Sequence, residues 1–208
     1  MLAYFREVNY LITAIGTDSG KTLVSAIITE ALKADYWKPV QSGLPRDTDT
    51  VTSLVSNAET VFHAERHLLK TPASPHAAAK IDEVQIQLDD FTLPRTDRDL
   101  VVEGAGGMLV PLNDEDYVID FASALDLEIV LVSNLYLGSI NHTLLSIEAL
   151  KNRGLKVKGI IFNGPSNPES ERVIEKKSGW PVLLRIPQLD IVNKETVQRL
   201  SEELLINW

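Results

Sequence analysis

A short glycine-rich turn holds the side chains of this sequence that are best suited to bind an anion. The turn runs Ala14-Ile15-Gly16-Thr17-Asp18-Ser19-Gly20-Lys21-Thr22, between an apolar run and a helix-length segment. Its small residues let successive backbone N–H groups point into one hollow, and the positive end of the following helix dipole adds to the attraction. Lys21 would reach the outer phosphates, and the Thr22 hydroxyl would bind a magnesium ion that bridges two phosphate groups.

The spacing of this turn departs from the general phosphate-loop pattern. That pattern requires a glycine five residues before Gly20, where this chain has Ile15, and the nearest glycine is Gly16. An ordinary strand-turn-helix with a coincidental Gly-Lys-Thr is the alternative. The apolar strand before the turn and the helix after it favour the phosphate loop, because this is the context that such a loop needs.

Two acidic residues are candidates to complete a magnesium site. Glu103 ends the apolar run that begins at Asp99 and precedes the flexible turn Gly104-Ala105-Gly106-Gly107, and Asp49 lies at the start of a predicted helix. Phosphate-loop enzymes take metal carboxylates from other strand ends at the same edge of the sheet. The alternatives are an ordinary acid at a strand end for Glu103 and helix capping or dipole pairing for Asp49.

A second lysine lies where another strand is expected to end. Lys38 belongs to Tyr36-Trp37-Lys38-Pro39-Val40-Gln41-Ser42-Gly43, and Pro39 fixes the exit from the strand. A lysine at this edge could stabilise charge on a transferred phosphoryl or carbamoyl group. The alternative is a solvated surface lysine.

Short apolar runs alternate with amphipathic, helix-length segments, which predicts a mostly parallel sheet with helices on both faces, as in P-loop NTPases. The predicted strands are Asn9–Gly16, Tyr36–Val40, Leu100–Glu103, Glu128–Ser133, Val157–Asn163 and Pro181–Ile186. The predicted helices are Thr22–Lys33, Thr48–Asn57, Pro75–Lys80, Val118–Leu125, Ile140–Arg153, Glu169–Lys177 and Lys194–Ile206, with Gly154 and Gly179 as stop signals. Phe62–Arg98 gives no clear pattern, and we expect residues 1–208 to form one domain.

Composition narrows the classes of function. The chain has 208 residues, 44% of them hydrophobic, and a formal net charge of -9, which argues against nucleic-acid binding through clustered Lys and Arg. It has no cysteine, and its four histidines are scattered, so a thiolate metal site is excluded and a zinc site is not indicated. No apolar run is long enough to span a bilayer, so we expect a cytoplasmic protein that does not bind membranes.

These motifs occur in the same order in dethiobiotin synthetases, and the chain resembles that family over nearly its whole length. The turn Gly16–Thr22 is similar to the family's phosphate loop, although Ala14 stands where the family often has glycine and Asp18 where it often has glutamate. The other matches are Lys38-Pro39-Val40-Gln41-Ser42-Gly43, Thr48-Asp49, Ser74-Pro75-His76, Val102-Glu103-Gly104-Ala105-Gly106-Gly107, Leu137-Gly138-Ser139-Ile140-Asn141-His142, Asn163-Gly164 and Ile186-Pro187.

The resemblance implies a C–N bond-forming ligase of biotin biosynthesis. In the family's reaction, 7,8-diaminononanoate takes up CO2 as a carbamate, ATP phosphorylates the carbamate, and the second amine expels phosphate to give dethiobiotin. The implied cofactor is Mg2+, with ATP as co-substrate, and the implied partners are small molecules and a second copy of the chain. In that homodimer the substrate site lies at the interface.

The resemblance also implies a role for each matching residue. It makes Lys38, Lys21 and Thr17 catalytic, and Thr22, Asp49 and Glu103 ligands of Mg2+. Substrate binding is implied for Ser42, Gly138, Ser139, Ile140 and Asn141, where the loop and helix start hold the substrate carboxylate. Nucleotide binding is implied for Asp18, Ser19, Gly20, Lys21, Thr22, Leu23, Asp49, Glu103, Gly104, Ala105, Gly106, Asn163, Gly164, Ile186, Pro187 and Gln188, with Asn163 at the adenine.

Other phosphate-loop proteins are the competing interpretations. A regulatory or partitioning ATPase of the related type carries a further lysine four residues before the glycine of Gly-Lys-Thr, and this chain has Gly16 there. A GTPase needs an Asn-Lys-x-Asp stretch to read guanine, which Asn163-Gly164-Pro165-Ser166 does not supply. A homologue that has lost catalysis would not need Lys21, Thr22, Lys38, Asp49 and Glu103 together.

Overall fold

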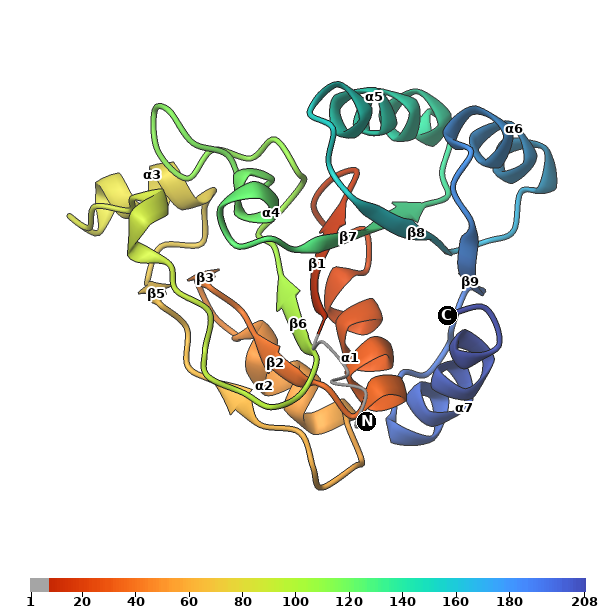
Figure 1. Ribbon diagram of the computed structural model, residues 1–208, viewed down its shortest axis with the longest axis horizontal. Helices are drawn as coiled ribbons and strands as arrows, with labels where there is room; N and C mark the ends of the chain where they lie inside the picture. The colour runs from red at the N-terminus through yellow and green to blue at the C-terminus, as the bar shows by residue number, and fades with distance from the viewer. Residues whose placement is uncertain (1–7) are drawn as a thin grey trace, which may run out of the picture.

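The computed structural model describes residues 8–208, and within them seven strands form one parallel sheet (Figure 1). The strand order is β4-β2-β6-β1-β7-β8-β9, so the first strand lies in the middle. The strands are β1 Asn9–Ala14, β2 Asp35–Trp37, β4 Phe62–His63, β6 Leu100–Glu103, β7 Glu128–Asn134, β8 Val157–Asn163 and β9 Val182–Ile186. Every neighbouring pair is parallel, which confirms the predicted fold class.

Helices cover both faces of this sheet (Figure 1). On one face α1 Lys21–Leu32 contacts both α2 Asp47–Leu54 and α7 Lys194–Leu205. On the other face lie α4 Asp120–Ala124, α5 Ser139–Asn152 and α6 Pro168–Ser178, with α3 Pro75–Ile81 and the 3-10 turn η1 Leu88–Asp90 toward the β2 side. Within residues 8–208, none of the helices combines the length and apolar composition needed to cross a membrane.

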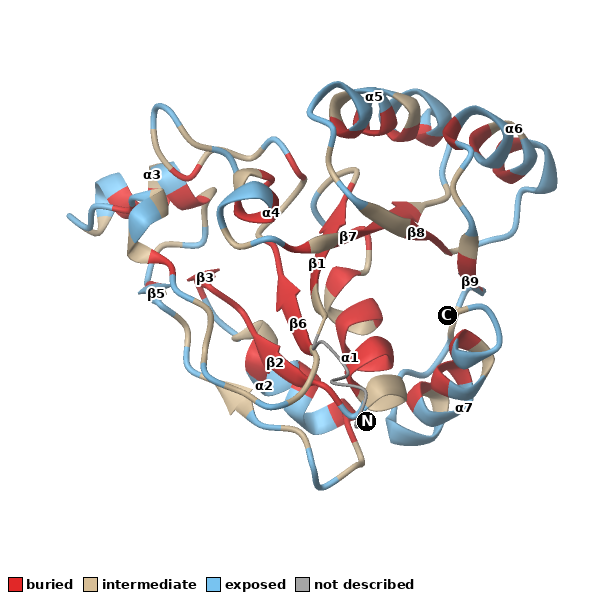
Figure 2. Ribbon diagram, in the orientation of Figure 1, coloured by how far each residue is buried: buried red, intermediate tan, exposed pale blue. Residues whose placement is uncertain are grey.

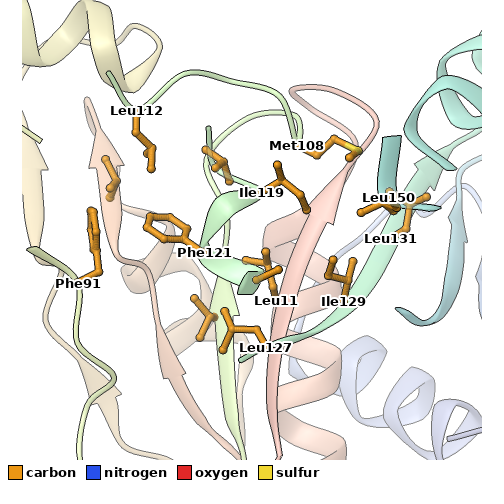
Figure 3. Packing of buried hydrophobic residues seen from close by; sticks show 14 of the residues in the cluster. Leu11, Phe91, Met108, Leu112, Ile119, Phe121, Leu127, Ile129, Leu131 and Leu150 are labelled. Atoms are coloured by element: carbon orange, nitrogen blue, oxygen red, sulfur yellow. The ribbon is translucent and has the colours of Figure 1, made fainter. Parts of the chain in front are cut away.

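The two faces of the strands supply two separate hydrophobic cores. Successive side chains of a strand point to opposite faces, so Leu11 joins the core under α4 and α5 while Ile12 joins the core around α1. Figure 3 shows the first core, in which Phe91 and Phe121 meet edge to face with ring centres 4.6 Å apart. The central strands are buried on both faces (Figure 2), which explains their apolar sequences without polar alternation.

Specific contacts explain both ends of α6 and the end of α2. The Asn167 side chain accepts a hydrogen bond from the Ser170 backbone N–H at the start of α6, and Gly179 ends that helix with a φ of 71°. Helix α2 ends at Leu54, three residues before the predicted end. The Glu30 carboxylate accepts hydrogen bonds from the backbone N–H groups of Ser56 and Asn57, which holds that segment outside the helix.

One predicted strand is wrong in its extent. The segment predicted as Tyr36–Val40 divides after Trp37, and the chain re-enters extended structure as β3 Val40–Ser42 in a second sheet with β5 His67–Leu69. Pro39 has no N–H to donate to the first sheet, and its carbonyl accepts from the N–H groups of Arg66 and His67 instead. Strands β4 and β5 were not predicted, because strands of two and three residues carry no periodic pattern.

Candidate functional site

The carboxyl ends of β1, β2 and β6 open into one pocket of about 740 Å3. Parallel strands bring these ends to the same edge of the sheet, so residues far apart in the chain face one another there. The described residues that line the pocket are Thr17, Asp18, Gly20, Lys21, Thr22, Lys38, Val40, Gln41, Ser42, Pro45, Asp47, Pro72, Ala73, Ser74, Pro75, Glu103, Ala105, Gly106 and Val110. The structure therefore brings together Lys21, Lys38 and Glu103, as the sequence analysis expected.

The phosphate turn is held by two neighbouring strand ends. The Ser19 hydroxyl donates at 2.9 Å to the side-chain oxygen of Asn134, the last residue of β7. The side-chain amide of Asn163, the last residue of β8, donates to the Ser19 carbonyl at 3.0 Å. Gly20 has a φ of 94°, and a Cβ at that position would lie 2.2 Å from Asn163 Nδ2. A glycine is thus required by both the backbone conformation and the close approach of the asparagine.

Lys21 begins α1 beneath this turn and is buried. Its ammonium donates to the Gly16 carbonyl at 3.4 Å. Burial, and then the positive charge of Lys38, lower the pKa of Lys21 to about 8. An anion in the turn would favour the charged lysine, so phosphate binding and protonation of Lys21 are coupled.

The carboxylate of Glu103, at the end of β6, is the centre of the hydrogen bonding in the pocket wall. Its Oε1 accepts from the Thr22 hydroxyl at 3.0 Å and from the Lys38 ammonium at 3.1 Å, and its Oε2 accepts from the Tyr36 hydroxyl at 2.9 Å. Glu103 itself is buried. The hydroxyl and the carboxylate expected to share a magnesium ion are therefore direct neighbours.

Lys38 is buried and points back from its strand end toward the phosphate turn. Its ammonium lies 2.7 Å from Asp47 Oδ2 and donates to the Gly104 carbonyl at 3.0 Å, besides its bond to Glu103. Burial alone would lower the pKa of Lys38, but the charges of Glu103 and Asp47 outweigh it and raise that pKa above its usual value. The two carboxylates therefore keep Lys38 positively charged. Its burial excludes the alternative of a solvated surface lysine.

Asp49 does not lie in this pocket, which corrects the expected placement. Its side chain is 57% exposed and forms an ion pair with Arg46, and Asp47 occupies the place beside Lys38. Two residues along an α-helix are separated by about 200°, so Asp47 and Asp49 face opposite ways. Asp47 was not singled out from the sequence: it lies one residue before the predicted helix Thr48–Asn57, and it stands in the first turn of α2.

The donor set at this wall fits Mg2+. Residues 8–208 contain no group of three or more His, Cys, Asp or Glu side chains that could hold a metal by themselves. Mg2+ is usually bound by one or two carboxylates, with substrate phosphates and water completing an octahedron. Thr22, Glu103 and Asp47 supply a hydroxyl and two carboxylates next to the phosphate turn, which matches that pattern.

The other residues predicted to bind substrate or nucleotide lie at several places along the same edge of the sheet. Thr17, Asp18, Ser42, Ala105 and Gly106 line the 740 Å3 pocket, and Gly104 is buried behind it. The Ser42 hydroxyl oxygen is buried and has no hydrogen-bond partner within residues 8–208. Ser19 is buried in the turn, and Leu23 packs against the core around α1.

The predicted carboxylate-binding residues lie at the end of β7, outside the 740 Å3 pocket. Gly138 precedes α5 with a φ of 104°, Ser139 is buried, and Ile140 and Asn141 are exposed. A second hollow of about 340 Å3 adjoins the first, and Thr17 and Val110 line both. Its described lining is Ile15, Gly16, Thr17, Gly107, Met108, Leu109, Val110, His142, Leu145 and Ser146.

The predicted adenine-binding residues follow β8 and β9. The Gly164 N–H donates to the Ile186 carbonyl at 2.9 Å, so the two strand ends remain joined beyond the sheet. Pro187 and Gln188 are exposed on this side. The Asn163 side chain also donates a hydrogen bond to the phosphate turn and so helps to hold it. This contact is separate from the role at the adenine that was predicted for Asn163.

A phosphate turn that leads from the central strand of a parallel sheet into a helix defines the P-loop class of nucleotide-binding domains. Residues 8–196 match the family described as AAA domain. Two solved structures share the fold at 14% identity: the cell-division protein MinD with Mg-ADP from Pyrococcus horikoshii (TM-score 0.58, 95% of each chain) and a ParA family ATPase from Chlorobium tepidum (TM-score 0.55, 96% of this chain and 91% of that one).

Sequence relatives identify the family within this class. The chain is 54% identical to the ATP-dependent dethiobiotin synthetase BioD of Cytophaga hutchinsonii, over 96% of this chain and 98% of that protein. It is 50% identical to the protein of the same name from Christiangramia forsetii, over 94% of this chain and 95% of that one. The chain belongs to the dethiobiotin synthetase family, which confirms the resemblance inferred from the motifs.

The coupling between Lys21 and bound phosphate predicts proton uptake. At pH 8.5 part of Lys21 is neutral in the free protein, and an anion in the turn draws a proton onto it. The nucleotide phosphates titrate near pH 6 and are ionised under these conditions. We expect titration calorimetry with Mg-ATP in buffers of different ionisation enthalpy to show uptake of a fraction of a proton at pH 8.5. Lys21→Arg should abolish the uptake, because arginine stays protonated; equal uptake by both proteins contradicts the assignment.

Proposed function

We propose that this chain is an ATP-dependent ligase that converts 7,8-diaminononanoate and CO2 into dethiobiotin, releasing ADP and phosphate. The proposal depends above all on Lys38, a buried cation held by Asp47 and Glu103 on the wall shared by the phosphate turn and the rest of the pocket. A fixed positive charge between a nucleotide and a second substrate is what phosphoryl transfer between them requires. Family membership supplies the identity of the substrates.

The chemistry proceeds in three steps that the pocket can accommodate. One amine of the substrate attacks CO2 and forms a carbamate. The carbamate oxygen then attacks the terminal phosphorus of ATP, giving a carbamoyl phosphate and ADP. The second amine attacks the carbamoyl carbon, and phosphate leaves as the cyclic urea closes.

The residues of the pocket divide this work. Lys21 and the backbone N–H groups of the turn hold the outer phosphates, and Lys38 stabilises negative charge on the carbamate and on the transferred phosphoryl group. Thr17 and Ser42, which line the pocket, are assigned to the diamine and the carbamate. Thr22, Glu103 and Asp47 would hold Mg2+, which supplies neutralisation of phosphate charge. Adenine binding is assigned to Asn163 and to residues 186–188.

The rest of the substrate suits a site shared by two chains. The aliphatic chain fits the adjoining hollow, whose lining is mostly apolar, and the carboxylate fits the start of α5, where free N–H groups and the helix dipole favour an anion. Tyr136, Leu137 and Ile140 are exposed around this helix start. We infer that they bury one another's apolar surface in a homodimer, with residues 138–141 of one chain completing the pocket of the other. The cytoplasmic location expected from the sequence belongs to the same proposal.

The ParA family and MinD structures share the fold with this chain at 14% identity. A shared fold at this identity does not indicate a shared activity. Gly16 stands where that class has its additional lysine. We therefore do not propose a partitioning function.

Reconstitution tests the proposed reaction. Protein, ATP, Mg2+, bicarbonate and 7,8-diaminononanoate should yield dethiobiotin by mass spectrometry, with one ADP per product. Lys38→Ala should lower kcat by at least about 10²-fold, the range seen when a group that stabilises transition-state charge is removed. Lys33→Ala, at an exposed lysine paired with Glu59, is the matched control and should retain activity. ATP hydrolysis without dethiobiotin, or full activity in Lys38→Ala, would refute the proposal.

The two aspartates of α2 should differ sharply in their effect. Asp47→Asn removes a charge beside Lys38 and next to the metal position, and we expect kcat/KM for Mg-ATP to fall about 10- to 100-fold. Asp49→Asn changes an exposed ion pair and should shift it less than about 3-fold. Initial rates at varied Mg-ATP concentration measure both. The opposite ranking would return the metal role to Asp49.

The shared site predicts that activity depends on dimerisation. Leu137 is fully exposed, and Leu137→Asp places a charge in the inferred contact. We expect this variant to sediment as a monomer, to keep its circular dichroism spectrum and to lose most synthetase activity. Ile206→Asp, at another exposed apolar residue, after α7, should behave as the wild type. A fully active Leu137→Asp monomer would exclude the shared site.

A further inference from the structure

Tyr36 has a buried hydroxyl that the roles assigned so far do not use. Its side chain is fully buried between the sheet and α1, and its hydroxyl donates to Glu103 Oε2 at 2.9 Å. Tyr36 is not among the described residues that line the 740 Å3 pocket. Any effect on the reaction must therefore pass through Glu103.

Strand register explains why this tyrosine reaches that carboxylate. Tyr36 on β2 is aligned with Val101 on the adjacent β6, and Glu103 lies two residues further along β6. Residues two apart on a strand share a face, and their Cα atoms are separated by roughly 6.5 Å. A tyrosine that leans along its strand spans this distance, so the hydroxyl meets the carboxylate inside the core.

The two carboxylate oxygens of Glu103 accept hydrogen bonds from different residues. Oε2 accepts from Tyr36, while Oε1 accepts from Thr22 and Lys38. The torsion that rotates a glutamate carboxylate is soft, so an unanchored carboxylate can turn and offer either oxygen. The bond from Tyr36 fixes that rotation and keeps Oε1 toward the metal and lysine side.

We propose that Tyr36 is a positioning residue of this enzyme, whose hydroxyl fixes the orientation of Glu103 for binding Mg2+-nucleotide. The inference rests on the proposed function for its link to turnover, but its effect on Mg2+-dependent nucleotide binding is independent of the substrate. Removing a hydrogen bond that orients a metal-binding side chain typically lowers metal affinity or activity 10- to 100-fold.

Tyr36→Phe is the appropriate variant, because it removes one oxygen and keeps the ring. The ring packs against Phe62, with centres 6.1 Å apart, and that contact does not need the hydroxyl. Tyr10→Phe is the matched control: Tyr10 lies in the same core on β1, is also buried, and packs against Trp208 rather than against the pocket.

Calorimetric titration with ATP, at a series of Mg2+ concentrations and with none, tests the inference without turnover. We expect Tyr36→Phe to bind metal-free ATP as the wild type does, but to need about 10-fold or more Mg2+ for the same gain in affinity. In the synthetase assay its kcat at low Mg2+ should fall by a similar factor and recover at high Mg2+, with an unchanged KM for the diamine. Tyr10→Phe should match the wild type in both assays.

A second variant separates positioning from general destabilisation. In a Glu103→Gln background, Tyr36→Phe should cause no further loss of Mg2+-dependent affinity, because the group it acts through has already been changed. An unchanged Mg2+ requirement in Tyr36→Phe, or an equal loss with and without Glu103, would overturn the inference. If the wild type binds Mg-ATP yet makes no dethiobiotin, the proposed function fails while the role of Tyr36 is still decided by binding.

Discussion

The buried carboxylate of Glu103 is the constraint on which the rest of the site depends. An isolated ionised carboxylate in a protein core is strongly destabilising, so its position is maintained only by charge pairing and hydrogen bonds. Tyr36 on β2, Lys38 just after β2 and Thr22 on α1 provide them. The same contacts that stabilise the charge also join the end of β6 to the phosphate turn.

This arrangement depends on the parallel sheet. Strand β6 lies between β1, which leads into the phosphate turn, and β2, which leads to Lys38, so Glu103 is the neighbour of both. Pro39 then directs the chain away from the main sheet into β3, and α2 starts only a few residues later with Asp47 beside Lys38. A continuous strand through residues 36–40 would carry this loop along the sheet and away from the phosphate turn. The break in the strand thus brings the Asp47 carboxylate beside Lys38.

The sequence alone predicted the parts of the structure that leave a clear local pattern. The apolar strand ending in Glu103 and the phosphate turn were predicted within a few residues, since burial on both faces and glycine chemistry leave clear patterns. Which of Asp47 and Asp49 faces Lys38 could not be predicted, because it depends on the rotational phase of a helix whose start was uncertain by one residue. The contact of Tyr36 depends on strand order and register, which no local pattern encodes.

The charges of the pocket explain why it is suited to a nucleotide and a second anion together. Lys38 is balanced by Glu103 and Asp47, whereas the Lys21 ammonium donates to a backbone carbonyl and is repelled by Lys38. Burial, and then the charge of Lys38, lower the pKa of Lys21 to about 8, although Glu103 and Asp47 act in the opposite direction. An anion bound in the turn would supply the negative charge that Lys21 lacks, whereas Glu103 and Asp47 keep Lys38 positively charged without a bound anion. The two lysines therefore differ: the charge of Lys21 depends on a bound anion, and the charge of Lys38 does not.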